Sequence, residues 1–463
     1  MTIAIIGAGT YGSYTVNSLQ EKYPEAEITV FDVGERSVKS EEEIGYLSHL
    51  KNRAYKGLTN GRYFGWGGAS HKWGGQLLSY TENDFKNPNA FMKGLIDLDK
   101  QYKDKCLAKF NIENKFPETK VSNELFTKTG VWLSMLHRNF FHWFKINKRK
   151  NVIVLSHCRV VKLVSKDKKN IESIIYLENG IEKIATFDYY FLTAGAFESV
   201  RILLSSEMMA DKKVYFSDHL SQKVFKIKGS TIIGDEDFVF RMRGTSLITK
   251  RLIGETSDIS YYIHPVFNLK FPFFEMVKEV LFYHNFSVKK LGDYILTTIK
   301  DIPHVLGFAW SVAVLRKMYV MNNEWFLYID IENPTKDSYV SLSTEKDKFG
   351  LPGLDVFYNI GDEAVSVYKK AQATAINHLN NCKVSYEIVA EKIDISTCED
   401  IYHPYGMLSF ETIDEYFHHW DNMLLVSTGI LPRSGGINPT AALFPLVDEF
   451  VEKHLKPQTP KGA

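Results

Sequence analysis

The sequence predicts an α/β protein whose nucleotide-binding domain is Rossmann-like and discontinuous. The first observation is a βαβ unit at the start of the chain, with an apolar strand at 3–6, a helix over about 13–23 and a second strand at 28–31. The second observation is another strand–glycine–helix turn over residues 189–205. It indicates that the same domain resumes there after an insertion.

The first turn of the βαβ unit has the pattern G-x-G-x-x-G, written GAGTYG at residues 7–12. Gly7 allows a sharp turn, Gly9 lets a diphosphate approach the backbone, and Gly12 lets helix and strand pack closely. The diphosphate would lie on the free N–H groups at the start of the helix. Asp32, 20 residues past the last glycine, can accept hydrogen bonds from an adenosine ribose. These residues favour a dinucleotide site over a purely structural turn, and they leave NAD, NADP and FAD open.

Composition limits the other function classes. The chain has 463 residues, which suggests two or three domains, and 44% of them are hydrophobic. Lys and Arg total 56 against 55 Asp and Glu, so the overall charge gives no reason to expect a nucleic-acid partner. The four cysteines are scattered without a C-x-x-C pair. We therefore expect no metal site, no disulfide framework and a reducing compartment.

The expected location is the cytoplasm. The first strand begins at residue 3, which leaves no room for a signal peptide. The longest purely apolar run, 305–315, is too short for a membrane-spanning helix. Both observations predict a soluble protein.

A glycine-rich segment follows the βαβ unit. Residues 60–76 contain six glycines and two tryptophans, Trp66 and Trp73. Such a segment either forms a backbone cradle over a large cofactor or is a turn-rich connection with two core tryptophans. Composition alone leaves both interpretations open.

The rest of the chain predicts a mixture of helices and short strands. The hydrophobic periodicity predicts helices over 91–110, about 129–144, 198–205, 363–380 and 440–455, and strands over 152–155, 160–164, 171–177, 181–187, 189–193, 259–263, 325–332, 338–342 and 424–426.

The stretch 267–320 is apolar and punctuated by lysines. Its aromatic runs at 271–274 and 308–310 can line a pocket, form a lid or touch a membrane surface. Core or lid packing is the favoured interpretation.

Two positions near the C-terminus carry the chemistry that the sequence predicts. His403 lies in a turn, YHPYG, and Asn438 ends a glycine-rich stretch that follows an apolar strand. Histidine can take and return a proton near neutral pH, and an asparagine amide can hold an oxygen without changing charge. Taken alone, His403 is one of 14 histidines, and a structural role would be the better guess.

Nearly the whole chain resembles the glucose–methanol–choline family of FAD-dependent oxidoreductases. The resemblance is carried by motifs in matching order: GAGTYG at 7–12, FGWGGASHKWGGQ at 64–76, FLTAGAFESVRILLSS at 191–206, FSDHL at 216–220, DSYVSLSTEKDKFGLP at 337–352, YHPYG at 402–406 and the closing motif at 432–438.

This resemblance implies FAD as cofactor and a discontinuous FAD-binding domain with an inserted α+β substrate domain built on an antiparallel sheet. The implied FAD-binding segments are 1–80, 150–223 and 400–463. Residues 81–149 would form a substrate or cap segment, and 224–399 the substrate-binding domain.

The resemblance also implies the catalytic roles. His403 would accept the proton of the substrate hydroxyl as a hydride leaves its carbon for flavin N5, and Asn438 would hydrogen-bond the same oxygen. The implied cofactor-binding residues are Gly7, Gly9, Thr10, Gly12, Asp32, Gly67, Gly68, Ser70, Trp73, Gly74, Gly75, Val161, Ala194, Gly195, Gly429, Asn438, Pro439 and Thr440.

The chain departs from the family pattern at three places. Ser427 stands where most members have an acidic residue, and residues 407–410 lack the usual continuation of the histidine motif. Some members attach flavin covalently through a histidine immediately before the tryptophan of the glycine-rich loop. Here that position is Lys72, with His71 one residue earlier, so we expect non-covalent FAD.

The leading hypothesis is an FAD-dependent alcohol dehydrogenase or oxidase acting on CH–OH donors. Its expected substrate is a small-molecule alcohol, such as a glycan, a glycolipid or a bulky natural product. Oxygen or another acceptor would receive the electrons, and 267–320 is a candidate peripheral membrane contact. The alternatives are a non-redox, lyase-like flavin enzyme and a catalytically inactive FAD-binding scaffold. An NAD-linked dehydrogenase would leave the glycine-rich loop and the asparagine motif unexplained.

Overall fold

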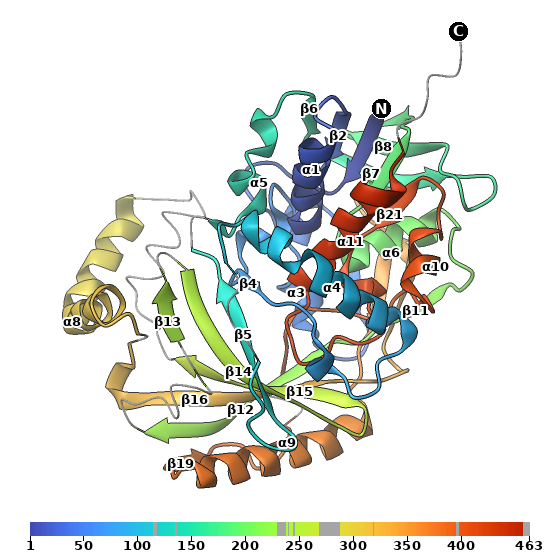
Figure 1. Ribbon diagram of the computed structural model, residues 1–463. Helices are drawn as coiled ribbons and strands as arrows, with labels where there is room; N and C mark the ends of the chain where they lie inside the picture. The colour runs from blue at the N-terminus through green and yellow to red at the C-terminus, as the bar shows by residue number, and fades with distance from the viewer. Residues whose placement is uncertain are drawn as a thin grey trace.

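A computed structural model describes residues 1–113, 118–134, 137–228, 238, 240–243, 246–267, 288–317, 319–394 and 398–456. It contains two large sheets, a parallel one surrounded by helices and an antiparallel one that carries a long helix on its outer face (Figure 1). Among the described residues, no helix combines the length and the apolar composition that crossing a membrane requires.

The parallel sheet is assembled from distant parts of the chain. Its strand order is β21-β10-β1-β2-β6, and every neighbouring pair is parallel. The strands are β1 (Thr2–Ile6), β2 (Glu27–Phe31), β6 (Val152–Leu155), β10 (Tyr189–Leu192) and β21 (Met423–Leu425). The discontinuous Rossmann-like fold is therefore confirmed, whereas the exact domain boundaries stay predictions.

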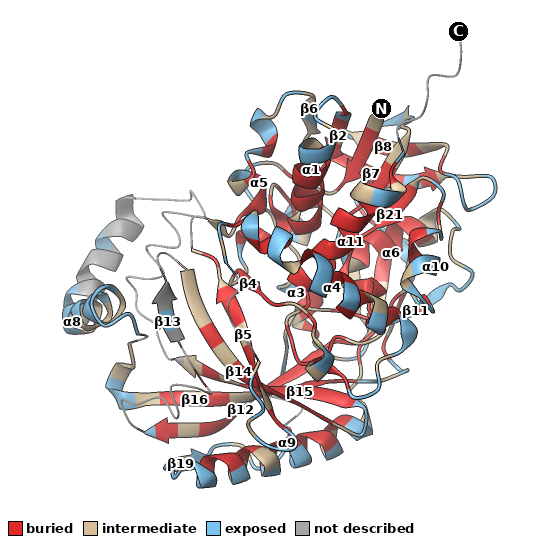
Figure 2. Ribbon diagram, viewed as in Figure 1, coloured by how far each residue is buried: buried red, intermediate tan, exposed pale blue. Residues whose placement is uncertain are grey.

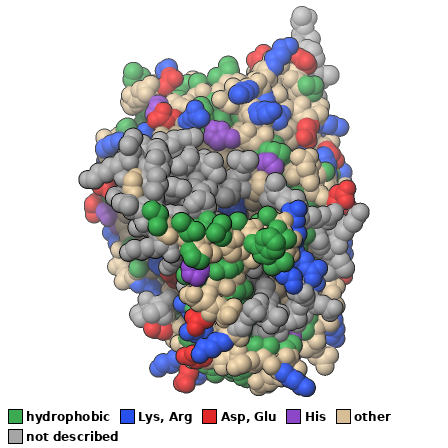
Figure 3. Space-filling model, turned by 90° about the vertical axis from the view of Figure 1, so that its left-hand side faces the viewer, with side chains coloured by type: hydrophobic (Ala, Val, Ile, Leu, Met, Phe, Trp, Pro, Cys, Tyr) green, Lys and Arg blue, Asp and Glu red, His purple; other side chains and the backbone are tan. Residues whose placement is uncertain are grey.

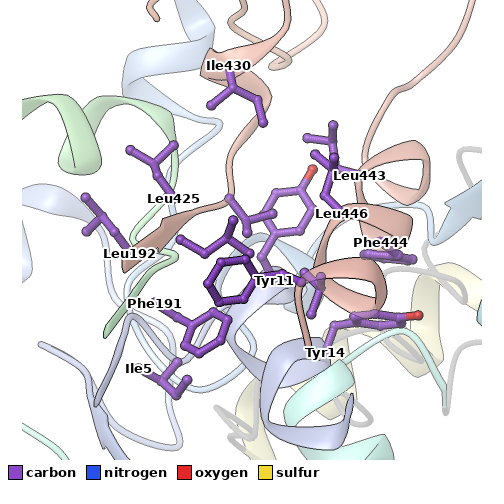
Figure 4. Packing of buried hydrophobic residues seen from close by; sticks show 14 of the residues in the cluster. Ile5, Tyr11, Tyr14, Phe191, Leu192, Leu425, Ile430, Leu443, Phe444 and Leu446 are labelled. Atoms are coloured by element: carbon purple, nitrogen blue, oxygen red, sulfur yellow. The ribbon is translucent and has the colours of Figure 1, made fainter. Parts of the chain in front are cut away.

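Helices from both ends and from the middle of the chain surround this sheet. They are α1 (Thr10–Lys22) and α11 (Phe444–Glu449) from the two ends and α6 (Ala196–Ser205) from the middle. The rings of Tyr14 in α1 and Phe444 in α11 stack with centroids 4.2 Å apart. Figure 4 shows these two rings beside the apolar side chains that the strands contribute. Burial of this shared core holds the first and last segments of the chain together.

The second large sheet is antiparallel, as expected. Its order is β19-β12-β16-β15-β14-β5-β4, with β13 beside β14 and β20 beside β12. The strands are β4 (Gln76–Leu77), β5 (Phe126–Trp132), β12 (His219–Lys228), β13 (Phe240–Arg243), β14 (Ser246–Thr256), β15 (Ile259–Phe267), β16 (Glu324–Glu332), β19 (Tyr386–Ile388) and β20 (Glu399–Asp400).

Helix α9 (Asp362–Asn381) covers one face of the antiparallel sheet (Figure 1). Its apolar side chains share a hydrophobic cluster with alternate residues of the strands, such as Leu252 and Ile263. Figure 2 shows that the central strands of both large sheets are mainly buried, whereas α9 exposes its outer side. The opposite face of this sheet is turned toward the parallel sheet and carries polar side chains, described below.

Two small sheets and further α-helices also belong to the fold. One small sheet has the order β11-β17-β18-β3 and the other β7-β8-β9. These elements are β3 (Ser48–Leu50), β7 (Cys158–Val164), β8 (Ser173–Glu178), β9 (Ile181–Ala185), β11 (Lys213–Tyr215), β17 (Tyr339–Lys346), β18 (Pro352–Phe357), α2 (Glu41–Ile44), α3 (Lys56–Thr59), α4 (Ala90–Ala108), α5 (Phe140–Trp143), α8 (Val288–Ala313) and α10 (Ile413–Phe417).

The helix predicted over 129–144 is wrong. Residues 126–132 form β5, which pairs with β14 on one side and β4 on the other. Among the described residues of the predicted range, the α-helix is limited to Phe140–Trp143. Thr127, Thr129 and Val131 are β-branched and alternate along β5. Such side chains fit a pleated surface, and pairing with a long neighbouring strand outweighs the apolar periodicity.

The stretch 267–320 is only partly described. Its first aromatic run, 271–274, lies outside the described residues. Residues 308–310 belong to α8, where Trp310 is 60% exposed and Leu306 is 64% exposed. Core packing is therefore the wrong interpretation for this face of α8.

The first glycine turn shows where the backbone needs glycine. Gly7 has a φ of 103°, in the region that side chains avoid. A Cβ at Gly12 would lie 1.9 Å from the carbonyl oxygen of Gly7, so helix α1 could not pack on β1. A Cβ at Gly9 would meet nothing nearer than the Cα of Gly68, 3.9 Å away. Gly12 is thus needed for the fold, and Gly9 is not.

Gly12→Ala should destabilise the protein, while Gly9→Ala should not. Because the backbone oxygen at residue 7 cannot move aside, we expect Gly12→Ala to lower the free energy of unfolding by at least about 2 kcal/mol. Gly9→Ala is the matched control, with an expected change below about 1 kcal/mol. Chemical denaturation monitored by circular dichroism measures both values, and equal losses in the two variants would contradict the packing argument.

Candidate functional site

A cavity of about 490 Å³ runs from the first glycine turn to the C-terminal motifs. It brings together most of the residues that the sequence singled out. The predicted site residues on its wall are Gly7, Gly9, Thr10, Asp32, Gly68, Trp73, Gly74, Gly75, Ala194, Gly195, His403, Asn438 and Thr440.

Six predicted residues do not line this cavity: Gly12, Gly67, Ser70, Val161, Gly429 and Pro439. Ser70 is used inside its own loop, where its hydroxyl donates to the Gly67 carbonyl over 2.6 Å. Val160 lines the cavity in place of Val161, because the pairing of β7 with β8 shifts register between Val160 and Lys162. The strand prediction was right, and the irregularity decides which side chain faces inward.

Asp32 is tied to the glycine turn. Its carboxylate oxygens each accept a backbone N–H, from Ala8 and from Gly34, at 2.8 Å. Burial raises the pKa of Asp32, and these two hydrogen bonds oppose that rise. Gly9 caps helix α1 without a side-chain hydrogen bond. The first N–H groups of α1 therefore lack the side-chain acceptor that most helices use, as an anion site requires.

A buried ionic cluster that the sequence analysis missed lies on the same wall. Glu198 bonds Arg62 at 2.5 Å and Arg201 at 2.7 Å. Burial raises the pKa of Glu198, but the guanidinium groups of Arg201 and Arg62 hold it below its usual value. The sequence shows only that Glu198 and Arg201 are three residues apart, a spacing at which side chains on a helix can pair. Arg62 is distant in sequence and reaches Glu198 only in the folded protein.

The glycine-rich loop is held against helix α5 by Asn139. The amide of Asn139 donates to the carbonyl of Trp66 and to His71 Nδ1, both over 3.0 Å. The indole N–H of Trp73 donates to the carbonyl of Arg138 at 2.9 Å. These bonds fix the path of the loop along the cavity, and one of them comes from Trp73 on the cavity wall.

Asp218 positions the turn that carries His403. Its buried carboxylate accepts the backbone N–H of His403 at 3.1 Å, that of His219 at 2.7 Å and the hydroxyl of Tyr55 at 2.7 Å. Residues 217 and 405 also exchange two backbone hydrogen bonds. The FSDHL motif at 216–220 therefore anchors the YHPYG turn at 402–406, although the two are far apart in sequence.

Glu332 positions the closing motif in the same way. Its carboxylate accepts the N–H of Gly435 at 2.8 Å and pairs with Arg433 at 2.7 Å. Arg433 also pairs with Glu255 at 2.8 Å, and His219 Nε2 donates to the carbonyl of Gly435 over 2.7 Å. Burial raises the pKa of Glu332, but Arg433 and the backbone donors lower it below its ordinary value. The stretch that leads to Asn438 is thus fixed to strands β14 and β16.

His403 is neutral over the usual pH range. Its pKa is lowered from 6.5 to about 3, mainly by burial and in addition by His219 and Arg251, while Asp330 opposes the shift. Its Nδ1 is buried and makes no hydrogen bond to the described residues. A neutral imidazole has one nitrogen with a free lone pair. The arrangement can therefore accept a proton from a ligand hydroxyl in the cavity.

Comparison with known proteins adds information on the fold alone. Neither a scan against protein-family models nor a search of curated protein sequences returns a match. Among solved structures, the chain is similar to pyridoxine 4-oxidase from Mesorbium loti, with 12% identity, a TM-score of 0.54, and 98% of this chain and 99% of that chain covered.

A second solved structure gives the same picture. It is the formate oxidase of Aspergillus oryzae, studied for FAD modification, with 10% identity, a TM-score of 0.53 and 97% of each chain covered. Both similarities extend over nearly the whole length, so they include both large sheets. The chain therefore has the fold of these two oxidases, the architecture that its resemblance to the glucose–methanol–choline family implies.

Proposed function

We propose that the cavity binds FAD non-covalently and that the protein uses it to oxidise an alcohol. One observation carries the proposal: the dinucleotide turn and the pair His403 and Asn438 line one continuous cavity. The first part suits the adenosine diphosphate of a dinucleotide, and the second suits a hydroxyl that loses a proton and a hydride. The coarse function, an FAD oxidoreductase, also agrees with the two oxidases of the same fold.

The residues present fit the adenosine diphosphate part of FAD. Gly9 leaves room beside the start of α1, which has no side-chain cap. There a diphosphate would accept hydrogen bonds from the first N–H groups of the helix. Asp32 keeps acceptor capacity beyond its two backbone bonds, because a carboxylate can accept about four hydrogen bonds.

Ser427 fits the cofactor as well. Its hydroxyl oxygen is buried and lacks a hydrogen-bond partner in the described part of the chain, and the residue lines the cavity. A hydroxyl can donate to the cofactor at this position, where family members carry an acid. The departure at Ser427 is thus compatible with FAD.

The expectation of non-covalent FAD has support from the glycine-rich loop. His71 is absent from the cavity wall, and its Nδ1 accepts the amide of Asn139. Lys72 occupies the wall, with its ammonium 4.8 Å from the centre of the Tyr63 ring.

The proposed mechanism assigns one task to each catalytic residue. FAD, when bound, would supply the acceptor for a hydride, which carries the two electrons of the oxidation. His403 accepts the proton of the substrate hydroxyl, which makes hydride loss from the same carbon easier. Asn438 donates its amide to the same oxygen and keeps the carbinol oriented. Asp218 and Glu332 act through the backbone and are positioning residues.

The substrate, the electron acceptor and the location are further parts of the proposal. A glycan, a glycolipid or a bulky natural-product alcohol remains the expected substrate, with oxygen or another electron acceptor, in the cytoplasm. A lyase-like flavin enzyme and an inactive scaffold remain the alternatives. A protein of either kind would bind FAD, but no alcohol would reduce the bound flavin.

The His403→Ala variant should still bind the flavin, but its flavin should no longer be reduced efficiently by the substrate. We expect the variant to retain FAD and its reduction by substrate to fall by at least about 100-fold, because general-base contributions are of this size. Anaerobic bleaching of the flavin band with a panel of sugars, sterols and aryl alcohols measures this. His418→Ala, on the exposed surface, is the control. A His403→Ala protein that bleaches at the wild-type rate would refute the role of His403.

Acid should destabilise the protein partly through His403. Its pKa is about 3 when folded and near 6.5 when unfolded. Between these values the unfolded chain binds the additional proton, so stability falls as the pH is lowered from 6.5 toward 3. His403→Asn should remove this contribution, at most about 1.4 kcal/mol per pH unit. Thermal midpoints between pH 4.5 and 7 measure the slope, and an unchanged slope would count against a buried neutral histidine.

We propose that helix α8 contacts an anionic lipid surface. Its exposed apolar side chains Ile299, Ile302, Leu306 and Trp310 recur at helical spacing, and the exposed Val314 and Leu315 follow the end of the helix at Ala313. The exposed cations Arg316 and Lys317 follow directly. Figure 3 shows hydrophobic side chains gathered on this face with Lys and Arg at the edge. An apolar stripe with an exposed tryptophan and adjacent cations is typical of helices that lie in a lipid interface.

Substituting this stripe should release the protein from membranes. We expect Leu306→Ser with Trp310→Ser to reduce cosedimentation with phosphatidylcholine–phosphatidylserine vesicles by at least about fivefold, since two large apolar groups are lost. Ile181→Ser with Ile184→Ser is the control, because these side chains on β9 are 66% and 67% exposed. Equal binding of wild type and the α8 variant would contradict the proposal, as would a concentration-dependent dimer abolished by the α8 substitutions.

A further inference from the structure

Arg251 lies on strand β14, on the face of the antiparallel sheet that is turned toward the cavity. It is 5% exposed. Its Nη2 donates to the side-chain oxygen of Gln76, whose amide donates in turn to Thr249 at 3.0 Å. Trp132 donates to the same hydroxyl at 2.9 Å. Because Gln76 and Trp132 line the cavity, the guanidinium is one hydrogen bond away from its wall.

The second terminal nitrogen of Arg251 is unpartnered. Nη1 is buried and has no hydrogen-bond partner among the described residues. Over the described ranges, Arg251 forms no ion pair. It also contacts Tyr262, whose ring centre is 4.3 Å away and whose hydroxyl interacts with both Arg251 and Asp330. The buried Arg201, by contrast, pairs with a buried carboxylate. Burying a cation without an anion costs several kcal/mol, so this position is unusual unless a ligand supplies the anion.

The nearby carboxylate does not fill this role. Asp330 is buried on β16, beside Tyr262 of β15 in the pairing of the two strands. Its Oδ2 lies 3.2 Å from His264 Nε2. His264, Ser221 and Tyr262 hold the pKa of Asp330 below its usual value, against the effect of burial. Asp330 is thus engaged by these neighbours and forms no ion pair with Arg251 within the described residues, so no carboxylate in direct contact compensates the Arg251 charge.

Arg251 also acts on the proposed base. Its charge is one of the causes that lower the pKa of His403. An anion bound to Arg251 would cancel this effect and make His403 a better proton acceptor. The uncompensated cation and the catalytic histidine are therefore electrostatically linked.

We propose that Arg251 binds a carboxylate of the substrate, so that the substrate is an alcohol that also carries an acid group. The inference rests on the proposed function and deepens it. The two N–H groups on Nη1 offer charge-assisted hydrogen bonds to a carboxylate oxygen. The substrate class is then a hydroxy acid, such as a sugar acid, and its carboxylate is held near the His403 end of the cavity.

The test measures carboxylate binding directly. FAD-loaded protein is titrated with sodium glucuronate and, as the neutral partner of the same shape, with glucose, at constant ionic strength. The thermal midpoint and the flavin absorbance are recorded together. We expect glucuronate to stabilise the wild-type protein and to perturb its flavin spectrum, and glucose to bind at least about tenfold more weakly, since a charged hydrogen bond is lost.

Three variants assign the effect to Arg251. Arg251→Met should weaken glucuronate binding at least about tenfold, Arg251→Lys should retain part of it, and the control Lys250→Met should bind like wild type. Lys250 is adjacent on β14 and has the same charge. Without ligand, Arg251→Met should be at least as stable as wild type, because an unpaired buried cation is removed.

Each contrary result overturns the inference. Equal glucuronate binding by wild type and Arg251→Met would exclude the proposed site. Loss of thermal stability in ligand-free Arg251→Met, by more than Lys250→Met loses, would assign a structural role to Arg251. Tighter binding of inorganic phosphate or sulfate would exclude a carboxylate as the preferred anion. Failure of the proposed function is distinguishable, because it would appear as absence of bound FAD or of bleaching by any alcohol.

Discussion

The site depends on two buried carboxylates at one end of a strand pair. His219 and Glu332 are opposite each other where β12 and β16 pair, and Asp218 immediately precedes this position. Asp218 accepts the backbone of the His403 turn, and Glu332 accepts the backbone and guanidinium of the closing motif. Without partners these carboxylates would be costly to bury, so each loop is required to satisfy the carboxylate that holds it. This mutual requirement brings His403 and Asn438 to the same cavity. The bonds that position them are made by the backbone and neighbouring residues of their loops and not by the two side chains.

Sequence reasoning succeeded where the information is local. The strand–turn–helix of residues 2–22, the returning strand at 189–192 and the motifs around His403 and Asn438 all lie within short contiguous stretches. Their roles in cofactor binding and catalysis stay predictions. Reasoning failed where partners are distant: β5 became a strand because β14 pairs with it, and the shifted register of β7 places Val160 on the wall. The ionic cluster of Arg62 and Glu198 joins residues 136 positions apart, and no pattern in the sequence predicts this pairing.

The buried polar and charged groups of the site are of two kinds, those with a partner in the described part of the protein and those without one. Most buried ionic groups are matched, as Glu198 with its two arginines and Glu332 with Arg433. Three of the buried polar atoms that have no hydrogen-bond partner among the described residues, Ser427 Oγ, His403 Nδ1 and Arg251 Nη1, are on or beside the cavity wall. A folded protein keeps such groups at a cost in stability, and ligand binding is the usual compensation. Their distribution along the cavity is what a cofactor at one end and a polar substrate at the other would require.

The central claim is that this cavity holds FAD, and the visible absorption spectrum of the purified protein tests it most directly. The protein is incubated with excess FAD, separated from free cofactor by gel filtration, measured, and then precipitated with acid. The account predicts one FAD per chain with the resolved bands of a buried flavin, and release of all of it into the acid supernatant. A chain that emerges colourless would contradict the assignment of the cavity. Flavin that stays with the acid pellet would contradict non-covalent binding.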